Sequence, residues 1–233
     1  MPIQRIRAIN FKSFSEIDID LRRFNVVIGS NAAGKSNFIG IFRFLRDIAQ
    51  HGLVNAIAMQ GGAEYLRNAK IGSIRDLEIS VVYQPDPSIE LLETKETEGP
   101  SLCMEFCESS YEFALRFDPH GDGFAITRDR LVIGCDISSC ISRDVAGSRQ
   151  KIGRGEIRIT SEMGGIHYEV DIPEGCPLTE RDFVPLSFRG KRLPEKTLLL
   201  ETPYAYPLPH VEKFFEHIAV YDFDPKLPKK GLP

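Results

Sequence analysis

The chain has 233 residues, of which 42% are hydrophobic and 27% are charged, a composition typical of a folded globular protein and unlike that of a disordered or fibrous chain. Lys and Arg number 29 against 33 for Asp and Glu, a net charge of −4, so no overall positive field attracts the chain to nucleic acid or anionic lipid. A length between one and two average domains predicts a core that carries a sizeable insertion.

Location and redox state follow from what the sequence does not contain. No apolar run approaches the roughly 20 residues that span a bilayer, and the N-terminus, from Met1 to Arg5, has no apolar segment of the signal-peptide type. We therefore expect a cytoplasmic protein and no membrane partner. The cysteines are odd in number and sparse, which predicts reduced thiols instead of a disulfide framework (Cys103, Cys107, Cys135, Cys140 and Cys176).

The N-terminal stretch changes period several times. Ile17, Ile19 and Leu21 alternate with aspartates, which predicts a half-buried strand. Residues 24–28 form a nearly continuous apolar run, which predicts a buried, parallel strand. Apolar residues then recur at steps of three and four over residues 38–49, which predicts an amphipathic helix closed by Gly52, and residues 53–60 predict a second, shorter one.

The middle of the chain alternates instead. Residues 77–83, 102–106, 111–117 and 166–172 each place apolar side chains at every second position, and turn-prone stretches separate them. We expect an antiparallel meander. Residues 134–156, rich in Ser, Gly and charge, predict a loop or a disordered excursion. A short helix is predicted over 210–217 and a buried strand over 218–221.

The motif that carries chemistry follows the apolar run. Residues 29–36 match G-x-x-x-x-G-K-S/T at every fixed position, between a predicted strand and a predicted helix (Gly29, Ser30, Asn31, Ala32, Ala33, Gly34, Lys35 and Ser36). Small residues let the backbone N–H groups surround a polyphosphate at a helix N-terminus. Lys35 is then expected to reach the β and γ phosphates and the Ser36 hydroxyl to ligate Mg²⁺. The motif therefore predicts a nucleotide polyphosphate and Mg²⁺ as ligands.

Three stretches carry a resemblance to a known family. Residues 6–14 (with Asn10, Phe11 and Lys12), residues 28–37 with Asn37 after the Walker A serine, and residues 42–45 resemble the start of ABC-type ATPases of the RecF, SMC and OLD kind, and especially bacterial ATPases labelled AAA. Gly61 and Gly62, and residues 220–225, are similar to later landmarks of that group.

The resemblance implies an α/β fold, a P-loop NTPase core of the ABC type with an inserted antiparallel β subdomain. It implies a first part of the core at residues 1–75, the β-rich subdomain at 76–205, and a return to the core at 206–233. It also implies nucleotide binding by residues 29–37, with Lys12 as a further basic residue at the nucleotide. A solvated surface position is the alternative for Lys12.

Two motifs of the family are not found in their usual form. Residues 161–165 are superficially similar to the signature motif by which such heads complete the ATP site of the other subunit. They lie between predicted strands, so we interpret them as a hairpin turn. The run that ends at Asp222 has the form of a Walker B strand, yet Phe223 occupies the place of the catalytic Glu. Asp222 and Asp224 are weak metal-site candidates. The chain therefore resembles the N-terminal part of an ATPase head, and catalytic residues are unknown.

Several functions stay open. The leading hypothesis is an ATP-binding head segment that hydrolyses ATP with a missing half or a partner, as a homodimer or with a second polypeptide. DNA repair and phage defence are the suggested pathways, and DNA is an open partner through basic clusters at residues 189–192 and 226–230. The alternatives are a non-catalytic interaction module with a vestigial P-loop and a P-loop GTPase. Two D-x-x-G matches, at Asp118 and Asp144, favour the GTPase, but no N-K-x-D motif accompanies them.

Overall fold

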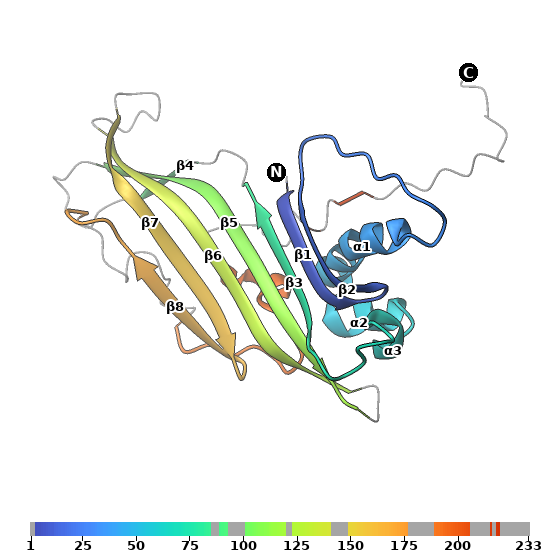
Figure 1. The fold of residues 1–233 in the computed structure, drawn as a ribbon. Coiled ribbons are helices and arrows are strands. Elements are labelled where there is room, and N and C mark those ends of the chain that lie inside the picture. Colours follow the sequence, from blue (N-terminus) through green and yellow to red (C-terminus); the bar gives the residue numbers. More distant parts are fainter. Residues whose placement is uncertain are drawn as a thin grey trace, which may run out of the picture.

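One antiparallel sheet dominates the computed structural model, which describes residues 3–84, 89–92, 101–119, 123–140, 149–176, 189–205, 215 and 218–219. Its eight strands run in the order β2-β1-β3-β5-β6-β7-β8, with β4 pairing the first half of β5 (Figure 1). The strands are β1 (Ile3–Phe11), β2 (Phe14–Asp20), β3 (Leu77–Tyr83), β4 (Ile89–Leu92), β5 (Ser101–Phe117), β6 (Phe124–Cys140), β7 (Arg149–Glu162) and β8 (Gly165–Asp171).

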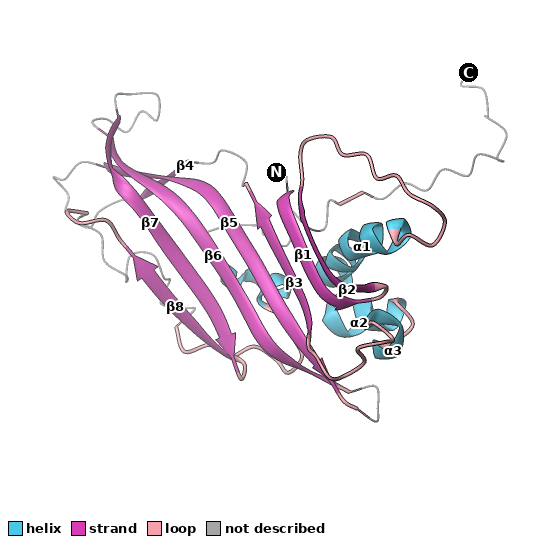
Figure 2. Cartoon of the chain, in the orientation of Figure 1, coloured by secondary structure: helices cyan, strands magenta, loops and turns pink. Residues whose placement is uncertain are grey.

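The helices gather on one face of this sheet, at the end formed by β1, β2 and β3 (Figure 2). They are α1 (Lys35–His51), α2 (Leu53–Met59) and α3 (Ala63–Leu66), and the 3-10 turns η2 (Leu199–Glu201) and η3 (Pro203–Ala205) follow much later in the chain. None of the helices in the described part of the chain combines the length and the apolar character that crossing a membrane needs.

The core lies between that face and the helices. Register places inward-pointing side chains side by side across the sheet: Ala8 pairs with Ile79 of β3, which pairs with Phe113 of β5. Phe44 of α1 is fully buried and contacts the rings of Phe11 and Phe113. The inward side chains of the strands, at every second residue, therefore pack with those on one face of α1 in a single hydrophobic cluster. This packing positions α1 against the sheet.

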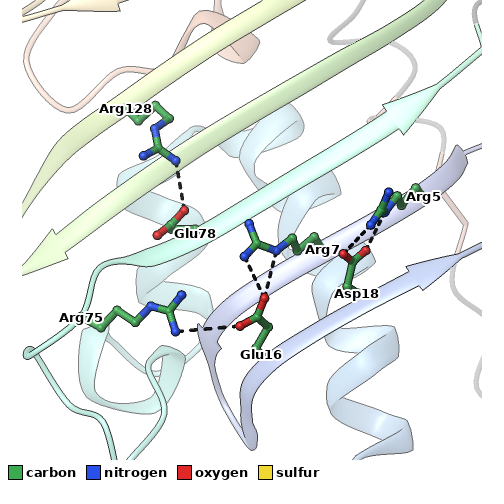
Figure 3. Close-up of polar contacts among 7 residues, drawn as sticks. All are labelled: Arg5, Arg7, Glu16, Asp18, Arg75, Glu78 and Arg128. Atoms are coloured by element: carbon green, nitrogen blue, oxygen red, sulfur yellow. Dashed lines mark hydrogen bonds and ion pairs between the residues drawn. The ribbon is translucent and has the colours of Figure 1, made fainter.

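The opposite face of the sheet is charged. Arg5 binds Asp18 through two hydrogen bonds of 2.7 and 2.6 Å, and Arg7 binds Glu16 across the same strand pair (Figure 3). Further along, Arg128 of β6 reaches Glu78 of β3 at 3.0 Å. These pairs form between strands because alternation places every second residue of each strand on the solvent side.

Most predicted elements are confirmed. The helical period at 38–49 corresponds to α1, which starts earlier, at Lys35, and is followed by Gly52 with a positive φ of 82°. The second helix is α2, and the alternating runs correspond to β3, β5 and β8. The predicted half-buried strand is β2, which also includes Phe14. The predicted helix at 210–217 and strand at 218–221 lie largely outside the described residues.

The predicted parallel strand at residues 24–28 is wrong. The strand pairs of the described residues are all antiparallel, and residues 24–28 have an irregular backbone with exposed side chains. A strand needs a neighbour for its backbone groups and cover for its faces, and the described residues provide neither here. The fold that is observed is a mostly antiparallel sheet with few helices.

Two smaller expectations also fail. Residues 134–140 and 149–156, expected within a loop, are the paired ends of β6 and β7, where Gly155 opposes Cys135. A side chain at Gly155 would lie 3.0 Å from the Asp171 carbonyl oxygen, so the glycine allows a close strand approach. Cys103 is disulfide-bonded, whereas Cys107, Cys135 and Cys176 are free thiols as expected.

Candidate functional site

The loop at residues 29–36 connects the exposed run to α1. A turn between the Ser30 carbonyl and the Ala33 N–H, at 3.3 Å, begins its bend, and the Gly34 carbonyl accepts the first α1 hydrogen bond, from Phe38, at 2.9 Å. Ala32 and Gly34 both have positive φ, of 65° and 91°. Two left-handed residues so close together make a compact curve that turns the chain into the helix.

Close packing against the β1–β2 hairpin is a second reason why position 34 requires glycine. A side chain there would lie 3.1 Å from the ring of Phe14 and 3.2 Å from the Ser13 hydroxyl. The β1–β2 hairpin therefore packs directly against the start of α1, and only a residue without Cβ combines this contact with its positive φ.

Lys35 closes the loop on itself. Its ammonium donates hydrogen bonds of 2.8 Å to the Gly29 carbonyl and 2.7 Å to the Ser30 carbonyl. The charge of Lys35 is thereby held inside the curve of the loop. This is where a polyphosphate surrounded by residues 29–36 would need a cation.

The start of α1 suits an anion. This 17-residue helix has no side-chain cap and no acidic residue in its first turn. Its first N–H groups and the positive end of its dipole therefore face the loop without a competing carboxylate. The Ser36 side chain is exposed in this first turn, as a hydroxyl that is to ligate Mg²⁺ must be. The residues present fit a magnesium polyphosphate.

Asn37 connects the helix to the hairpin. Its side-chain amide donates a 2.8 Å hydrogen bond to the Ser13 hydroxyl. The contact places Asn37 on the hairpin side of the helix and gives it a positioning contact beside the loop. Ser13 was not among the predicted site residues, because only the tertiary contact reveals it.

Lys12 lies in the same hairpin but its ammonium is directed elsewhere. It donates a 2.7 Å hydrogen bond to Gln60 Oε1 beyond α2, and it lies beside Gly40, further along α1 than the loop. Burial lowers the pKa of Lys12, and the nearby charge of Arg43 lowers it further. Lys12 is therefore half-buried and hydrogen-bonded, and not solvated. Its ammonium lies beside a later turn of α1 than the turn that follows the loop.

The other residues that the sequence analysis singled out do not join the loop in the described structure. Residues 161–165 form the β7–β8 hairpin, where Glu162 pairs with Gly165 and Met163 and Gly164 have positive φ, so the turn interpretation is confirmed. Asp118 lies where β5 ends, and Asp144, Asp222 and Asp224 are outside the described residues. Among the residues that the structure describes, no group of three or more His, Cys, Asp or Glu side chains could hold a metal ion.

Comparison with known proteins identifies the family of the chain. A family described as AAA ATPase domain matches residues 1–129, a stretch that contains α1, the loop before it and the sheet from β2 to the first part of β6. Because the match covers more than half of the 233 residues, the chain belongs to the AAA ATPase domain family. No curated protein and no solved structure matches it.

Proposed function

We propose that the chain binds ATP with Mg²⁺ at residues 29–37, as the nucleotide-binding part of a P-loop ATPase head. The observation that carries the proposal is the position of the Lys35 ammonium, held by the Gly29 and Ser30 carbonyls at the uncapped start of α1. The family match supplies the reaction class, since an ATPase domain uses ATP.

Each residue has a distinct task in this proposal. Lys35 exchanges its two carbonyl partners for phosphate oxygens, which are the stronger, charged acceptors. The first-turn N–H groups of α1 donate to the same phosphates, and the Ser36 hydroxyl is a ligand of the metal. Bound Mg²⁺ supplies charge neutralisation on the phosphates. Asn37 keeps the hairpin against the helix, so the loop stays in place during the exchange.

Hydrolysis requires more than this loop. Phosphoryl transfer to water needs groups that orient the water and further charge beside the γ phosphate, and the described residues hold no acidic cluster for that purpose. We propose that a second copy or a second polypeptide contributes these groups. The division of the chain at residues 75/76 and 205/206 belongs to the same proposal, as does a cytoplasmic location; DNA contact stays a prediction.

Isothermal titration of the chain with a non-hydrolysable ATP analogue and Mg²⁺ tests the proposal. Binding is expected for the wild type and is expected to be lost in Lys35→Ala. Lys70→Ala, which removes an exposed lysine outside the loop, is the matched control and keeps wild-type affinity. Unchanged affinity in Lys35→Ala refutes the site.

The same preparations separate the alternatives. An analogue at about 100 times its dissociation constant adds roughly 2.7 kcal/mol to stability and raises the melting temperature. If no nucleotide raises it, the interaction-module hypothesis replaces this one. Equal competition by GTP and ATP favours the GTPase.

A further inference from the structure

A pocket opens at the end of the sheet formed by β6, β7 and β8. Its volume is about 410 Å³, which falls within the range of small-molecule sites. The start of β6, the β7–β8 hairpin and residues 192–197 form its walls. The loop before α1 lies at the other end of the sheet, beside β1 and β2 (Figure 1). The pocket is therefore separate from the proposed nucleotide site.

Hydrogen bonds to main-chain groups hold the walls of this pocket together. The Leu193 N–H donates to the Gly164 carbonyl at 2.7 Å, and Arg192 forms a β-bridge with Gly165. The Arg192 guanidinium also donates a 3.1 Å hydrogen bond to the Met163 carbonyl. Because these contacts fasten the later segment to the hairpin, the pocket is preorganised, which lowers the ordering cost of binding a ligand.

Two residues of the walls have an unfavourable backbone conformation. Met163, with φ of 46°, precedes Gly164 in the hairpin turn, at a position where Asn, Asp or Gly is usual. Lys196, with φ of 60°, is the third residue of a turn in which the Thr197 N–H bonds to the Pro194 carbonyl at 3.3 Å, and glycine is usual there. Strained residues of this kind cluster at ligand sites. Their side chains are therefore candidates for a role in the pocket.

The pocket contains two cations without a carboxylate partner among the described residues. The Lys196 ammonium lies 5.1 Å from the centre of the Phe124 ring, a cation–π contact that places its charge at the pocket. The printed contact of the Arg192 side chain is with a carbonyl oxygen. By contrast, Arg116 and Arg128 on the outer face of the sheet each bind a carboxylate. Two cations in one pocket suit an anionic ligand.

The remaining lining limits the charge and adds apolar surface. Arg192, Lys196 and Glu195 are the charged side chains of the lining, which gives one net positive charge. Leu193 is buried beneath the pocket and Met163 is 96% exposed. The flexible thioether of a methionine adapts to the shape of a ligand. The pocket therefore combines one net positive charge with an adaptable apolar surface.

We propose that this pocket binds a small aromatic carboxylate. A single negative charge matches the lining, and the planar guanidinium of Arg192 suits two parallel hydrogen bonds to a carboxylate, with Lys196 as a second cation. A ring is favoured because ammonium, thioether and aromatic groups all attract aromatic rings, and Lys196, Met163 and Phe124 provide them. A doubly charged phosphate would bring its second charge near Glu195, and like charges repel.

Isothermal titration of the full chain with naphthoate, an aromatic carboxylate, tests the proposal. The wild type is expected to bind it. Arg192→Gln and Lys196→Gly should each weaken binding by about tenfold or more, because each removes a charged hydrogen-bond donor. Glycine accepts a positive φ at position 196, so the turn is kept. Lys191→Gln, which changes an exposed lysine of the same segment outside the lining, is the matched control and should keep wild-type affinity.

Two comparisons separate charge recognition from apolar binding elsewhere. Naphthamide, a neutral analogue of the same shape, should bind the wild type about tenfold more weakly, and this comparison needs no variant. Lys35→Ala should leave the affinity for naphthoate unchanged, because the loop before α1 is a separate site. The result is therefore independent of whether the chain binds ATP.

The methyl resonance of Met163 reports where the ligand lies. In a chain with methyl-labelled methionine, naphthoate should shift this resonance, which Met163→Leu assigns. The inference is overturned if the wild type does not bind naphthoate up to about 1 mM, if naphthamide binds equally well, or if both pocket variants keep wild-type affinity. A shift confined to another methionine overturns it as well.

Discussion

A carboxyl group in the core offers a direct test of the structure. Asp129 of β6 is 2% exposed and lies on the inward face of the sheet. Its carboxylate accepts hydrogen bonds of 2.8 Å from the Tyr111 hydroxyl and 2.8 Å from the Leu199 N–H. It thereby connects β5 and β6 to η2, whose Glu201 in turn lies against Gly52 between α1 and α2.

Burial raises the pKa of Asp129 to about 7, although the two hydrogen bonds act in the opposite direction. The ordinary value is 3.8, so the folded state holds this proton more tightly than the unfolded state. The resulting stability is complete below the unfolded pKa and is lost as the pH rises towards 7. At about 1.36 kcal/mol for each pKa unit, a difference of about three units corresponds to a limit of about 4 kcal/mol.

Asp129→Asn should remove this pH dependence. The amide is neutral throughout, can accept from the Leu199 N–H, and can donate to the Tyr111 oxygen. Urea unfolding of both proteins, followed by two probes at several pH values, gives the difference in unfolding free energy. That difference is expected to move by up to about 4 kcal/mol in favour of the variant between about pH 4 and pH 8.

A matched control removes the other titrations. Glu201, whose pKa burial also raises, is present in both proteins. Asp171→Asn replaces an exposed aspartate of β8 and is expected to follow the wild-type profile. Parallel pH profiles for the wild type and Asp129→Asn would refute the argument that this carboxyl is buried beneath η2.

Three further predictions concern the helix side of the sheet. Phe44→Ala, at a side chain with no exposure, should cost about 3–5 kcal/mol in urea unfolding; a loss below about 1 kcal/mol would contradict its place in the core. Gly34→Ala should weaken analogue binding and lower stability, because it combines a positive φ with a contact to the hairpin, whereas Gly72→Ala, with positive φ but open space, should lower stability only. Lys12→Ala should reduce nucleotide affinity by less than about tenfold, since its ammonium is bound to Gln60, and an effect as large as that of Lys35→Ala in the same titration would show that Lys12 moves to the phosphates.

Local periodicity predicted much of the fold. The alternation in residues 77–83 and 111–117 gave paired strands β3 and β5, and the period of 3.6 gave α1, because one-sided burial imposes its spacing on the sequence of each element. The loop motif likewise predicted a bend into a helix. The motif accounts for one reason why residue 34 is glycine, its left-handed backbone conformation. The second reason, the close contact with the ring of Phe14, follows only from the tertiary structure.

Other features depend on neighbours far away in the sequence. Lys12 finds Gln60 and Asn37 finds Ser13 only because the hairpin lies against α1, and Asp129 occupies a core position that a nearby backbone N–H and hydroxyl make tolerable.

Residues 24–28 show most clearly the difference between what local sequence predicts and what tertiary contacts decide. Their sequence predicts a buried apolar strand ahead of the loop at residues 29–36, and the structure shows an exposed, irregular segment instead. Whether such a run is buried depends on a second strand beside it, and in the described chain its four apolar side chains are exposed. Composition and period determine what a segment can form, whereas pairing and burial require partners, and only the tertiary structure decides which partners are present.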